Sequence, residues 1–427
     1  MDKGKYFKRI TNVDLDREID SIKKKIESLR NLRLTILTSL KNFPSRLKRR
    51  VSVGSLRFLD SEIKRLEERL YFLEVLRSRI SGFTDREIEN FKKDIKNLKA
   101  HFKTFKYMYR TKRKKAIDEF LFSLEDIPPI GKEYWFMLFT SFDSTQIVTT
   151  FGRYNNKFTF NDCVIDGRRN SGDRLEGACT VWYFNEGKHE IPTYSGELKV
   201  EKNQLSCVNS SLKIEFEGKY PNYRLSLSED GEEFCNLKLV KLGHGKTSEF
   251  DEFFKGMFGY QLLNLYFSYS GTLRDKKISG RCYLQKVVVV GPFLPWKWGR
   301  INFENDYVFT YFSVKLEGLG LKKKLINYAK LYDSKRDKTL NFEEIEMKNF
   351  GEGSRWLIEA TSPNKKLMLF LKTYCVHPFT FRSKGSWSYN EHFVEVLDFL
   401  LEGEKNLDLS SLGKGFGLVE DSRGFII

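Results

Sequence analysis

Histidine, cysteine and long apolar runs are scarce in this sequence of 427 residues. The five histidines stand at His101, His189, His244, His377 and His392. No two of them have the spacing of metal ligands, so we expect no metal site. The six cysteines are scattered singly without a C-x-x-C pair, which predicts reduced, buried thiols rather than a zinc site or a disulfide framework. No window approaches 18 consecutive apolar residues, so no transmembrane helix is expected.

The short motifs of the large enzyme classes are also missing. The sequence contains no G-x-x-x-x-G-K-[ST], G-x-S-x-G or H-E-x-x-H. Its glycine-spaced segment at residues 415–420 has no strand-then-helix setting, so it is not a dinucleotide fingerprint. The first ten residues lack the apolar core of a secretory signal. We therefore expect a cytoplasmic protein, free or peripheral to the membrane, that uses no cofactor.

Uncharged amides are few where charged side chains are abundant. Only four glutamines occur, whereas Asp, Glu, Lys and Arg make up 31% of the chain. In heat-adapted proteins ion pairs replace thermolabile amides, so this bias predicts a thermophilic habitat. It indicates nothing about function.

The net charge of +17 is concentrated at the front of the chain. Residues 1–127 hold 33 of the 74 basic side chains and 19 of the 57 acidic ones. Such a field attracts polyanions, either nucleic acid or an anionic membrane surface. The candidate polyanion-binding residues form two clusters: Arg46, Lys48, Arg49 and Arg50, then Lys112, Arg113, Lys114 and Lys115. A solvated helical surface is the alternative, because many charges have opposite neighbours at helical spacing.

Residues 1–127 have a helical apolar period. Apolar residues recur at alternating spacings of three and four over 13–41 and again over 55–80. Thr84 and Glu87 form a capping box that would start a third helix. A seam of this period must be covered by partner helices, and the short links favour antiparallel neighbours. The pattern predicts a basic three-helix antiparallel coiled coil.

After residue 129 the apolar period changes to two. Short alternating runs are separated by glycine, asparagine and aspartate turns, and no helical pattern lies between them. This arrangement is typical of an antiparallel sandwich or barrel. Residues 248–259 read as a connector, which divides the region into β domains at 130–250 and 256–427.

All six tryptophans follow residue 130. Two of them, Trp296 and Trp298, lie in a proline-rich stretch at 292–299 that is poor strand material. Such a stretch suits a rigid aromatic loop at the mouth of a cavity. The candidate ligand-binding residues are Trp296, Trp298, Tyr311, Trp356 and Trp387. Ordinary core packing is the alternative for most of these side chains.

Two residues are candidate proton donors. Glu420 follows an apolar stretch, and burial would raise its pKa enough for general acid catalysis. His377 precedes a proline among aromatic residues and could donate a proton inside an apolar cavity. The alternatives are a structural hydrogen bond for Glu420 and a satisfied core histidine for His377. Glu391 and Asp306 are weaker candidates.

Four segments resemble the lipocalin-like superfamily that includes carotenoid 1,2-hydratases and AttH-type proteins. They are residues 278–286 (ISGRCYLQK), 295–305 (PWKWGRINFEN), 387–391 (WSYNE) and 415–420 (GFGLVE). The resemblance covers about residues 130–427 and implies two consecutive calycin-like barrels with an isoprenoid or other apolar ligand. The chain departs from hydratase-like members after its glycine-started strand, where Gln285 stands near the place of an acid. An amide cannot protonate an alkene.

Together the patterns and the resemblance predict a multidomain α and β fold. An N-terminal antiparallel helical coiled-coil module would precede two antiparallel lipocalin-like β-barrels. The first functional hypothesis is a carrier for an isoprenoid or lipid, docked through its basic helices. The second is an isoprenoid-modifying enzyme of hydratase or cyclase type, which uses a buried acid. The third is a nucleic-acid-associated protein, which would bind duplex through residues 1–127.

Overall fold

The computed structural model divides the chain into two compact units, Met1–Asn97 and Leu98–Ile427. Each unit is considered by itself. The structure describes residues 12–41, 60, 62, 63, 66, 67, 70, 116–128, 131–168, 175–185, 187–191, 195–255, 258–291, 293–318, 321–351, 353–383, 385–403 and 406–426.

The described part of the first unit is dominated by helix α1 (Asn12–Lys41). A stripe of isoleucines along α1 is buried at the spacing expected for one helix face: Ile19, Ile22 and Ile26. These side chains pack against Ile63 and Leu66. Arg30 pairs with Glu67 at 2.6 Å beside this contact, where exposure limits its contribution to stability.

The predicted fold class is wrong as stated. Among the described residues the helices with given bounds are α1, α4 (Ile117–Leu121) and α5 (Leu409–Leu412), the described residues at 60, 62, 63, 66, 67 and 70 are also helical, and strands predominate; a coiled-coil module is not formed there. The apolar seam at 13–41 does produce α1, but a seam specifies a covered face and not a bundle of three helices. The predicted third helix and both basic clusters lie outside the described residues. None of the described helices has the length and hydropathy that a membrane span requires.

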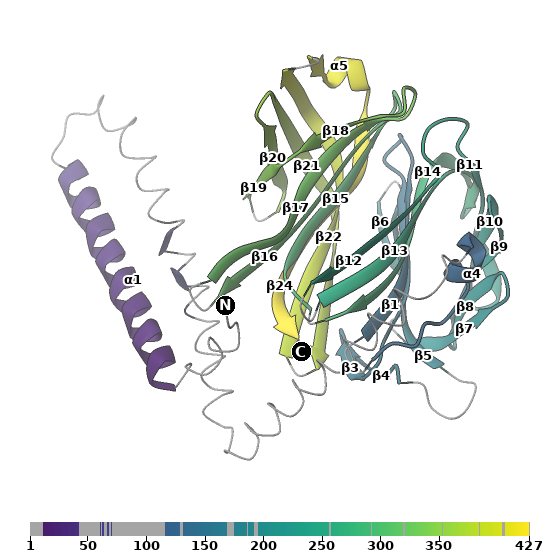
Figure 1. The fold of residues 1–427 in the computed structure, drawn as a ribbon, viewed down its shortest axis with the longest axis horizontal. Helices are drawn as coiled ribbons and strands as arrows, with labels where there is room; N and C mark the ends of the chain where they lie inside the picture. The colour runs from purple at the N-terminus through teal and green to yellow at the C-terminus, as the bar shows by residue number, and fades with distance from the viewer. Residues whose placement is uncertain are drawn as a thin grey trace. The chain divides into compact units, whose positions relative to one another are not determined.

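The first β-sheet is a closed antiparallel barrel, coloured blue to teal in Figure 1. Ten described strands follow one another around it in chain order. They are β1 (Gly131–Thr140), β2 (Gln146–Tyr154), β5 (Leu175–Phe184), β7 (Gly196–Glu201), β8 (Gln204–Val208), β9 (Leu212–Lys219), β10 (Asn222–Glu229), β11 (Glu232–Lys241), β13 (Phe258–Leu273) and β14 (Lys276–Val290). Strand β14 returns to pair with β1, and β11 pairs with the second half of β13. The prediction of a β-barrel is therefore confirmed.

Two further strands extend this sheet outside the ring. Strand β6 (Lys188–Ile191) pairs with β5, and β12 (Ser248–Lys255) pairs with the first half of β13. The predicted connector at 248–259 thus forms β12 and the start of β13. The division between the two β-sheets falls after Val290, so the predicted division at 250–256 lies within the first sheet.

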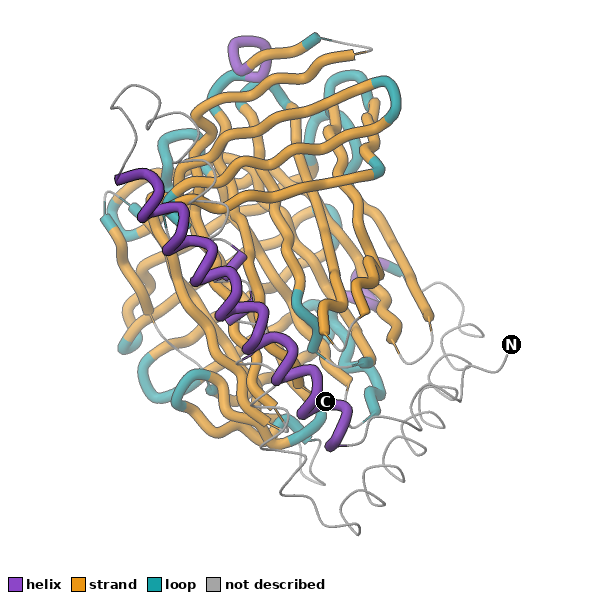
Figure 2. Tube along the Cα trace, turned by 90° about the vertical axis from the view of Figure 1, so that its left-hand side faces the viewer, coloured by secondary structure: helices purple, strands orange, loops and turns teal. Residues whose placement is uncertain are grey.

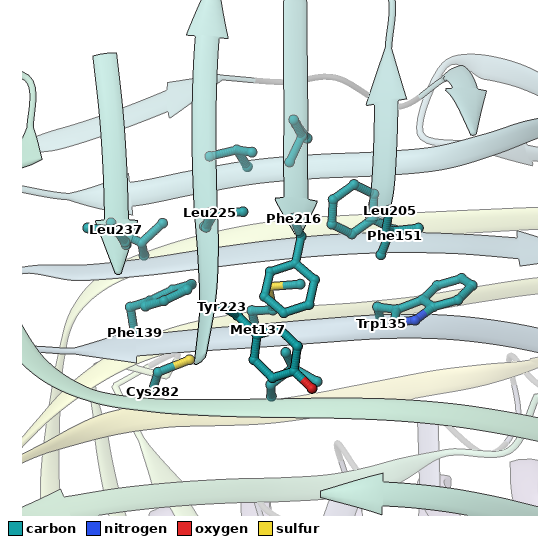
Figure 3. Packing of buried hydrophobic residues seen from close by; sticks show 14 of the residues in the cluster. Trp135, Met137, Phe139, Phe151, Leu205, Phe216, Tyr223, Leu225, Leu237 and Cys282 are labelled. Carbon is teal, nitrogen blue, oxygen red and sulfur yellow. The ribbon is translucent and has the colours of Figure 1, made fainter. Parts of the chain in front are cut away.

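The interior of the barrel is filled by its own side chains. Alternate residues of β1, namely Trp135, Met137 and Phe139, point inward together with side chains from the other strands (Figure 3). Phe120 and Leu121 of α4 join the same core. Each large apolar side chain buried in this way contributes roughly 1.5–3 kcal/mol.

A buried ion cluster ties the segment around α4 to the barrel. The carboxylate of Glu133 lies 3.0 Å from Nζ of Lys286 and 2.8 Å from the guanidinium of Arg153. Lys286 also donates hydrogen bonds to the backbone carbonyls of Phe120 and Ser123. Because these charges are shielded from water, each requires the others as partners.

The second β-sheet, green to yellow in Figure 1, is antiparallel and wraps around its own core. Its strand order is β18-β17-β16-β15-β24-β22-β21-β20-β19. The strands are β15 (Trp296–Phe303), β16 (Tyr307–Gly318), β17 (Leu321–Asp333), β18 (Lys338–Phe342), β19 (Glu344–Phe350), β20 (Arg355–Ser362), β21 (Lys365–Ser383), β22 (Gly385–Gly403) and β24 (Gly415–Ile426). Strand β23 (Leu407–Asp408) pairs with β22.

Early strands of the chain also join the second sheet. Strand β3 (Lys157–Phe160) pairs with β21 and with β4 (Cys163–Asp166). The outer faces of the two sheets meet through an apolar layer that includes Phe136 of β1 and Phe393 of β22. Long strands therefore lie on both sides of one shared layer, and the two sheets stand side by side in Figure 1. Figure 2, turned by 90°, shows that strands (orange) make up most of the described chain.

The expectation of six reduced cysteines is wrong for two of them. Cys179 of β5 and Cys207 of β8 form a disulfide inside the first barrel. Strand β7 lies between β5 and β8, and it pairs with β5 over only three residues, 175–177. The disulfide thus links β5 to β8 in the part of the barrel wall where β5 and β7 share few backbone hydrogen bonds. Isolated cysteines in the sequence do not indicate this pairing, because the two residues come together only through the positions of β5 and β8 on either side of β7.

Candidate ligand cavity and acid pair

A cavity of about 640 Å³ lies between the two sheets. The first sheet contributes outward-facing residues such as Tyr134 and Phe136 of β1, which alternate with the inward-facing core residues. The second sheet contributes Trp296 and Trp298 of β15. The hypothesis of a guest inside a barrel is therefore corrected: the core of the first barrel and the core of the second sheet are packed, and the space lies between the outer faces of the two sheets.

The predicted ligand-binding residues divide into two groups. Trp296, Trp298 and Trp387 line the cavity. Tyr311 and Trp356 are buried in the core of the second sheet instead. The predicted polyanion-binding residues lie outside the described residues, so docking through them stays a sequence-based prediction.

A row of functional side chains crosses four neighbouring strands of the second sheet. Trp298 of β15 pairs in register with Glu420 of β24. Glu420 pairs with Glu391 of β22, and Glu391 pairs with His377 of β21. Directly opposed residues of antiparallel strands point to the same face of a sheet, so these side chains all face the first barrel.

Glu420 lines the cavity and is only 9% exposed. Its Oε2 accepts a hydrogen bond of 2.7 Å from Nε1 of Trp296. Burial raises the pKa of Glu420 to about 7, and the Trp296 hydrogen bond limits the rise. Near neutral pH this carboxyl can therefore both hold and release a proton.

Glu391 is the second carboxyl of the pair. Its Oε2 accepts a hydrogen bond of 2.6 Å from Nε1 of Trp182, which belongs to β5 of the first barrel. Burial raises the pKa of Glu391 well above its usual range, and repulsion from Glu420 adds to the rise. A hydrogen bond from Tyr389 opposes that rise. The pair therefore binds protons more tightly than two separate exposed carboxyls do.

His377 lies one strand beyond Glu391 and does not line the cavity. Its ring is buried, with its centroid 5.5 Å from that of Trp182 and 4.4 Å from that of Phe379. Glu391 therefore stands between His377 and the cavity. Of the two predicted proton donors, Glu420 is the one that reaches the cavity surface.

The other end of the cavity is polar. Arg300 of β15 lies over the rings of Tyr266 and Tyr283, at 4.9 and 4.6 Å from their centroids. Gln285, where the resemblance led us to look for an acid, donates hydrogen bonds to Asn264 and to the hydroxyl of Tyr283. Acidic side chains line the cavity from both sheets, among them Glu249 of β12, but the two carboxyls that lie directly opposite each other come from β24 and β22.

Sequence reasoning missed Arg300 and Lys132, which both line the cavity. Arg300 could have been found, since it follows Trp296 and Trp298 at alternate positions of one segment. Lys132 donates a hydrogen bond to the Gly291 carbonyl, with its Nζ 4.0 Å from the centroid of the Phe293 ring. Burial lowers the pKa of Lys132 to about 7. No local pattern in the sequence indicates that burial.

Proton transfer is the chemistry that these side chains themselves offer. The carboxyl of Glu420 faces aromatic rings that exclude water and stabilise positive charge. Within the described ranges, no three His, Cys, Asp or Glu side chains come together as a metal site would require. The arrangement combines an apolar wall, a poised acid and a separate cationic end.

No known protein family matches the sequence, and no curated protein is similar to it. Among solved structures, CghA with Sch210972 has a TM-score of 0.42 at 10% identity, over 70% of this chain and 88% of that chain. Another structure of CghA gives 0.41 at 11% identity, with the same coverage. Kievitone hydratase from Nectria haematococca gives 0.31 at 12%, over 69% of this chain and 88% of its own. Likeness at these scores assigns neither family nor activity, so the cavity geometry carries the argument.

Proposed function

We propose that the protein binds an unsaturated apolar small molecule, of the isoprenoid or lipid class, between its two sheets and protonates it with Glu420. The observation that carries this proposal is the cross-strand pair of Glu420 and Glu391, which is buried in an aromatic cavity wall. The activity would be that of a hydratase or cyclase.

The acid pair favours catalysis over transport alone. Burying a carboxyl without a cationic partner is costly, and burying two carboxyls opposite each other adds repulsion between them. A carrier of a neutral apolar molecule gains nothing from that cost, because apolar contact with Trp296 and Trp298 suffices for binding. A proton donor does gain, since the raised pKa keeps Glu420 protonated near neutral pH.

The proposed step moves one proton. The O–H bond of the Glu420 carboxyl breaks, and the electron pair of a substrate double bond forms a new C–H bond. The resulting carbocation lies against the faces of Trp296 and Trp298, which stabilise it by cation–π attraction. Addition of water followed by proton loss gives hydration, whereas attack by a second double bond followed by proton loss gives ring closure. In both outcomes the lost proton restores Glu420.

Deuterium incorporation tests the proposal while the substrate is still unidentified. An organic extract of the source cells is incubated with the protein in D₂O and analysed by mass spectrometry. We expect at least one apolar component to gain deuterium with the wild-type protein and none to gain it with Glu420→Gln. Glu395→Gln is the matched control, because Glu395 lies on β22 outside the cavity and pairs with Lys372.

The carrier hypothesis predicts a different outcome. Extract components would then co-purify with the wild-type protein and with Glu420→Gln alike, and none would gain deuterium. That result would reject the acid chemistry and leave a binding protein.

A further inference from the structure

Arg300 is a buried cation in the cavity wall for which the described residues supply no carboxylate within ion-pair distance. Its side chain lines the cavity, and the residue is only 8% exposed. One terminal nitrogen donates a long hydrogen bond of 3.4 Å to the hydroxyl of Thr310. Its Nε is buried without a hydrogen-bond partner among the described residues. The guanidinium therefore retains unused donors inside a cavity.

Other buried cations of the same unit either pair with a carboxylate or can lose their proton. Arg153 and Lys286 share the carboxylate of Glu133. Lys132 has no such carboxylate among the described residues, but an amine can release its proton, and burial lowers the pKa of Lys132 to about 7. A guanidinium cannot release its proton in a protein. Arg300 must therefore remain charged. Glu249 acts on it through its charge, but no ion pair joins the two, so the guanidinium still has room for a paired carboxylate.

The two tyrosines beside Arg300 do not neutralise it. The hydroxyl of Tyr266 donates to Glu249, and the hydroxyl of Tyr283 donates to Asn264. Their rings present their faces to the guanidinium, which leaves the planar edge with its N–H donors available. That edge is the part of arginine that binds a carboxylate through two parallel hydrogen bonds.

Arg300 lies near the acid pair, one alternate residue along β15 from Trp298, which is directly opposite Glu420. Trp298 and Arg300 are alternate residues on one face of β15, so they stand roughly 7 Å apart along the strand. Glu420 lies directly across from Trp298 on the neighbouring strand, roughly 5 Å away. A molecule whose anionic group binds Arg300 could extend along Trp298. The carbon that then lies beside Glu420 would be about 8 Å from that anionic group.

We propose that the ligand is an amphipathic unsaturated acid, whose carboxylate binds Arg300 and whose apolar chain runs along Trp298 to Glu420. This inference rests on the proposed function for the position of the reacting carbon. Recognition of the carboxylate stands on Arg300 itself. The carboxylate orients the molecule, because Arg300 holds its charged end while its apolar chain lies along the aromatic wall that leads to Glu420.

Matched probes that share one polyene skeleton test the inference on the full chain. All-trans-retinoic acid carries a carboxylate where all-trans-retinol carries an alcohol, and both quench tryptophan fluorescence on binding. For the wild-type protein we expect retinoic acid to bind about tenfold more tightly than retinol or better. Arg300→Met should abolish this preference while changing retinol affinity by less than about threefold. Arg300→Lys should retain part of the preference, because it keeps the charge without the fork of donors.

Arg281→Gln is the matched control. Arg281 also lines the cavity but already pairs with Asp306, so its replacement should leave the preference for retinoic acid unchanged. The wild-type comparison needs no variant, so a folding defect in Arg300→Met does not remove the test.

The outcomes separate this inference from the proposed function. Equal affinity of the wild-type protein for both probes, or a preference that survives in Arg300→Met, overturns the carboxylate assignment alone. Retinoic acid preference without Glu420-dependent deuterium incorporation overturns the acid chemistry alone. Binding of neither probe overturns both.

Discussion

At the scale of single residues, Glu420 makes the stability of the folded protein depend on pH. Its pKa rises from the usual 4.5 to about 7 on folding, because burial disfavours the charged form. Between these values the folded state binds more protons than the unfolded state, so the free energy of unfolding falls as pH rises. The contribution is fully present below pH 4.5 and is lost as pH passes about 7.

The prediction concerns the difference between the wild-type protein and Glu420→Gln. Relative to the variant, the wild-type free energy of unfolding should decrease by about 3 kcal/mol between pH 4.5 and pH 8. Urea unfolding at a series of pH values measures this difference. Glu391 is coupled to Glu420, so the difference reports the titration of the acid pair. His392, whose pKa is lowered to about 4 by burial, is present in both proteins. A pH-independent difference would show that burial does not raise the pKa of the pair.

The buried ion cluster allows a second prediction at this scale. Glu133→Gln removes the carboxylate that Lys286 and Arg153 share, which leaves two buried cations without it. We expect the free energy of unfolding to fall by about 3–5 kcal/mol, as measured in urea. The control Glu197→Gln disrupts the exposed pair with Lys199 and should cost less than about 1 kcal/mol. Equal effects of both variants would contradict the structural role of the cluster.

Sequence could identify some site residues and not others for a physical reason. Glu420 was predicted because an acid that follows an apolar stretch is unusual. Arg300 was not, since its isolation depends on which carboxylates other strands bring near it. Tyr311 and Trp356 were chosen for being aromatic, and only their strand register shows that they face the second core.

At the scale of elements, the alternation of apolar and polar residues along the chain was the pattern from which most of the strands could be predicted. The period-two runs after residue 130 indicated antiparallel strands, and strands formed. The 292–299 stretch was predicted as a loop because of its prolines, yet β15 begins at Trp296, directly after the second proline. Sequence period says nothing about closure, since β1 and β14, the first and last strands of the ring, lie far apart in the sequence and meet only when the ring is complete.

The disulfide supplies a prediction at this scale. It closes a loop with a sequence separation of 28 residues, at the point where β5 and β7 share few backbone hydrogen bonds. Reduction with dithiothreitol should lower the free energy of unfolding by about 3–4 kcal/mol. Cys207→Ala should be destabilised to a similar extent and should no longer respond to the reductant. Cys163→Ser, which replaces a free thiol, should respond as the wild-type protein does. A wild-type protein that ignores the reductant would contradict the pairing.

At the scale of the whole molecule, function depends on two sheets sharing one layer. Strand β1 shows this arrangement. Nearly all ten of its residues are buried, both those that point to one face of the sheet and those that point to the other. A strand of a lone barrel would alternate between buried and exposed residues. Sequence could show that residues 134–139 of β1 are all apolar or aromatic, but it could not show that a second sheet, formed more than 150 residues later, covers the outer face.

This arrangement predicts which tryptophan reports on the cavity. Trp298 lines it, whereas Trp356 lies in the core of the second sheet and donates a hydrogen bond to Thr373. Retinol should quench less fluorescence in Trp298→Phe than in the wild-type protein. In Trp356→Phe, retinol should still quench the fluorescence of the tryptophans that line the cavity. The opposite pattern would place the ligand inside the second sheet.

A space bounded by two outer faces has one more consequence. The side chains that shape it, such as Tyr134 and Thr310, belong neither to the core of the first barrel nor to the core of the second sheet. Selection can therefore change which guest is accepted without disturbing the packing inside either sheet. One face of each strand can therefore vary with the ligand, while the other face of the same strand keeps the residues that the fold needs.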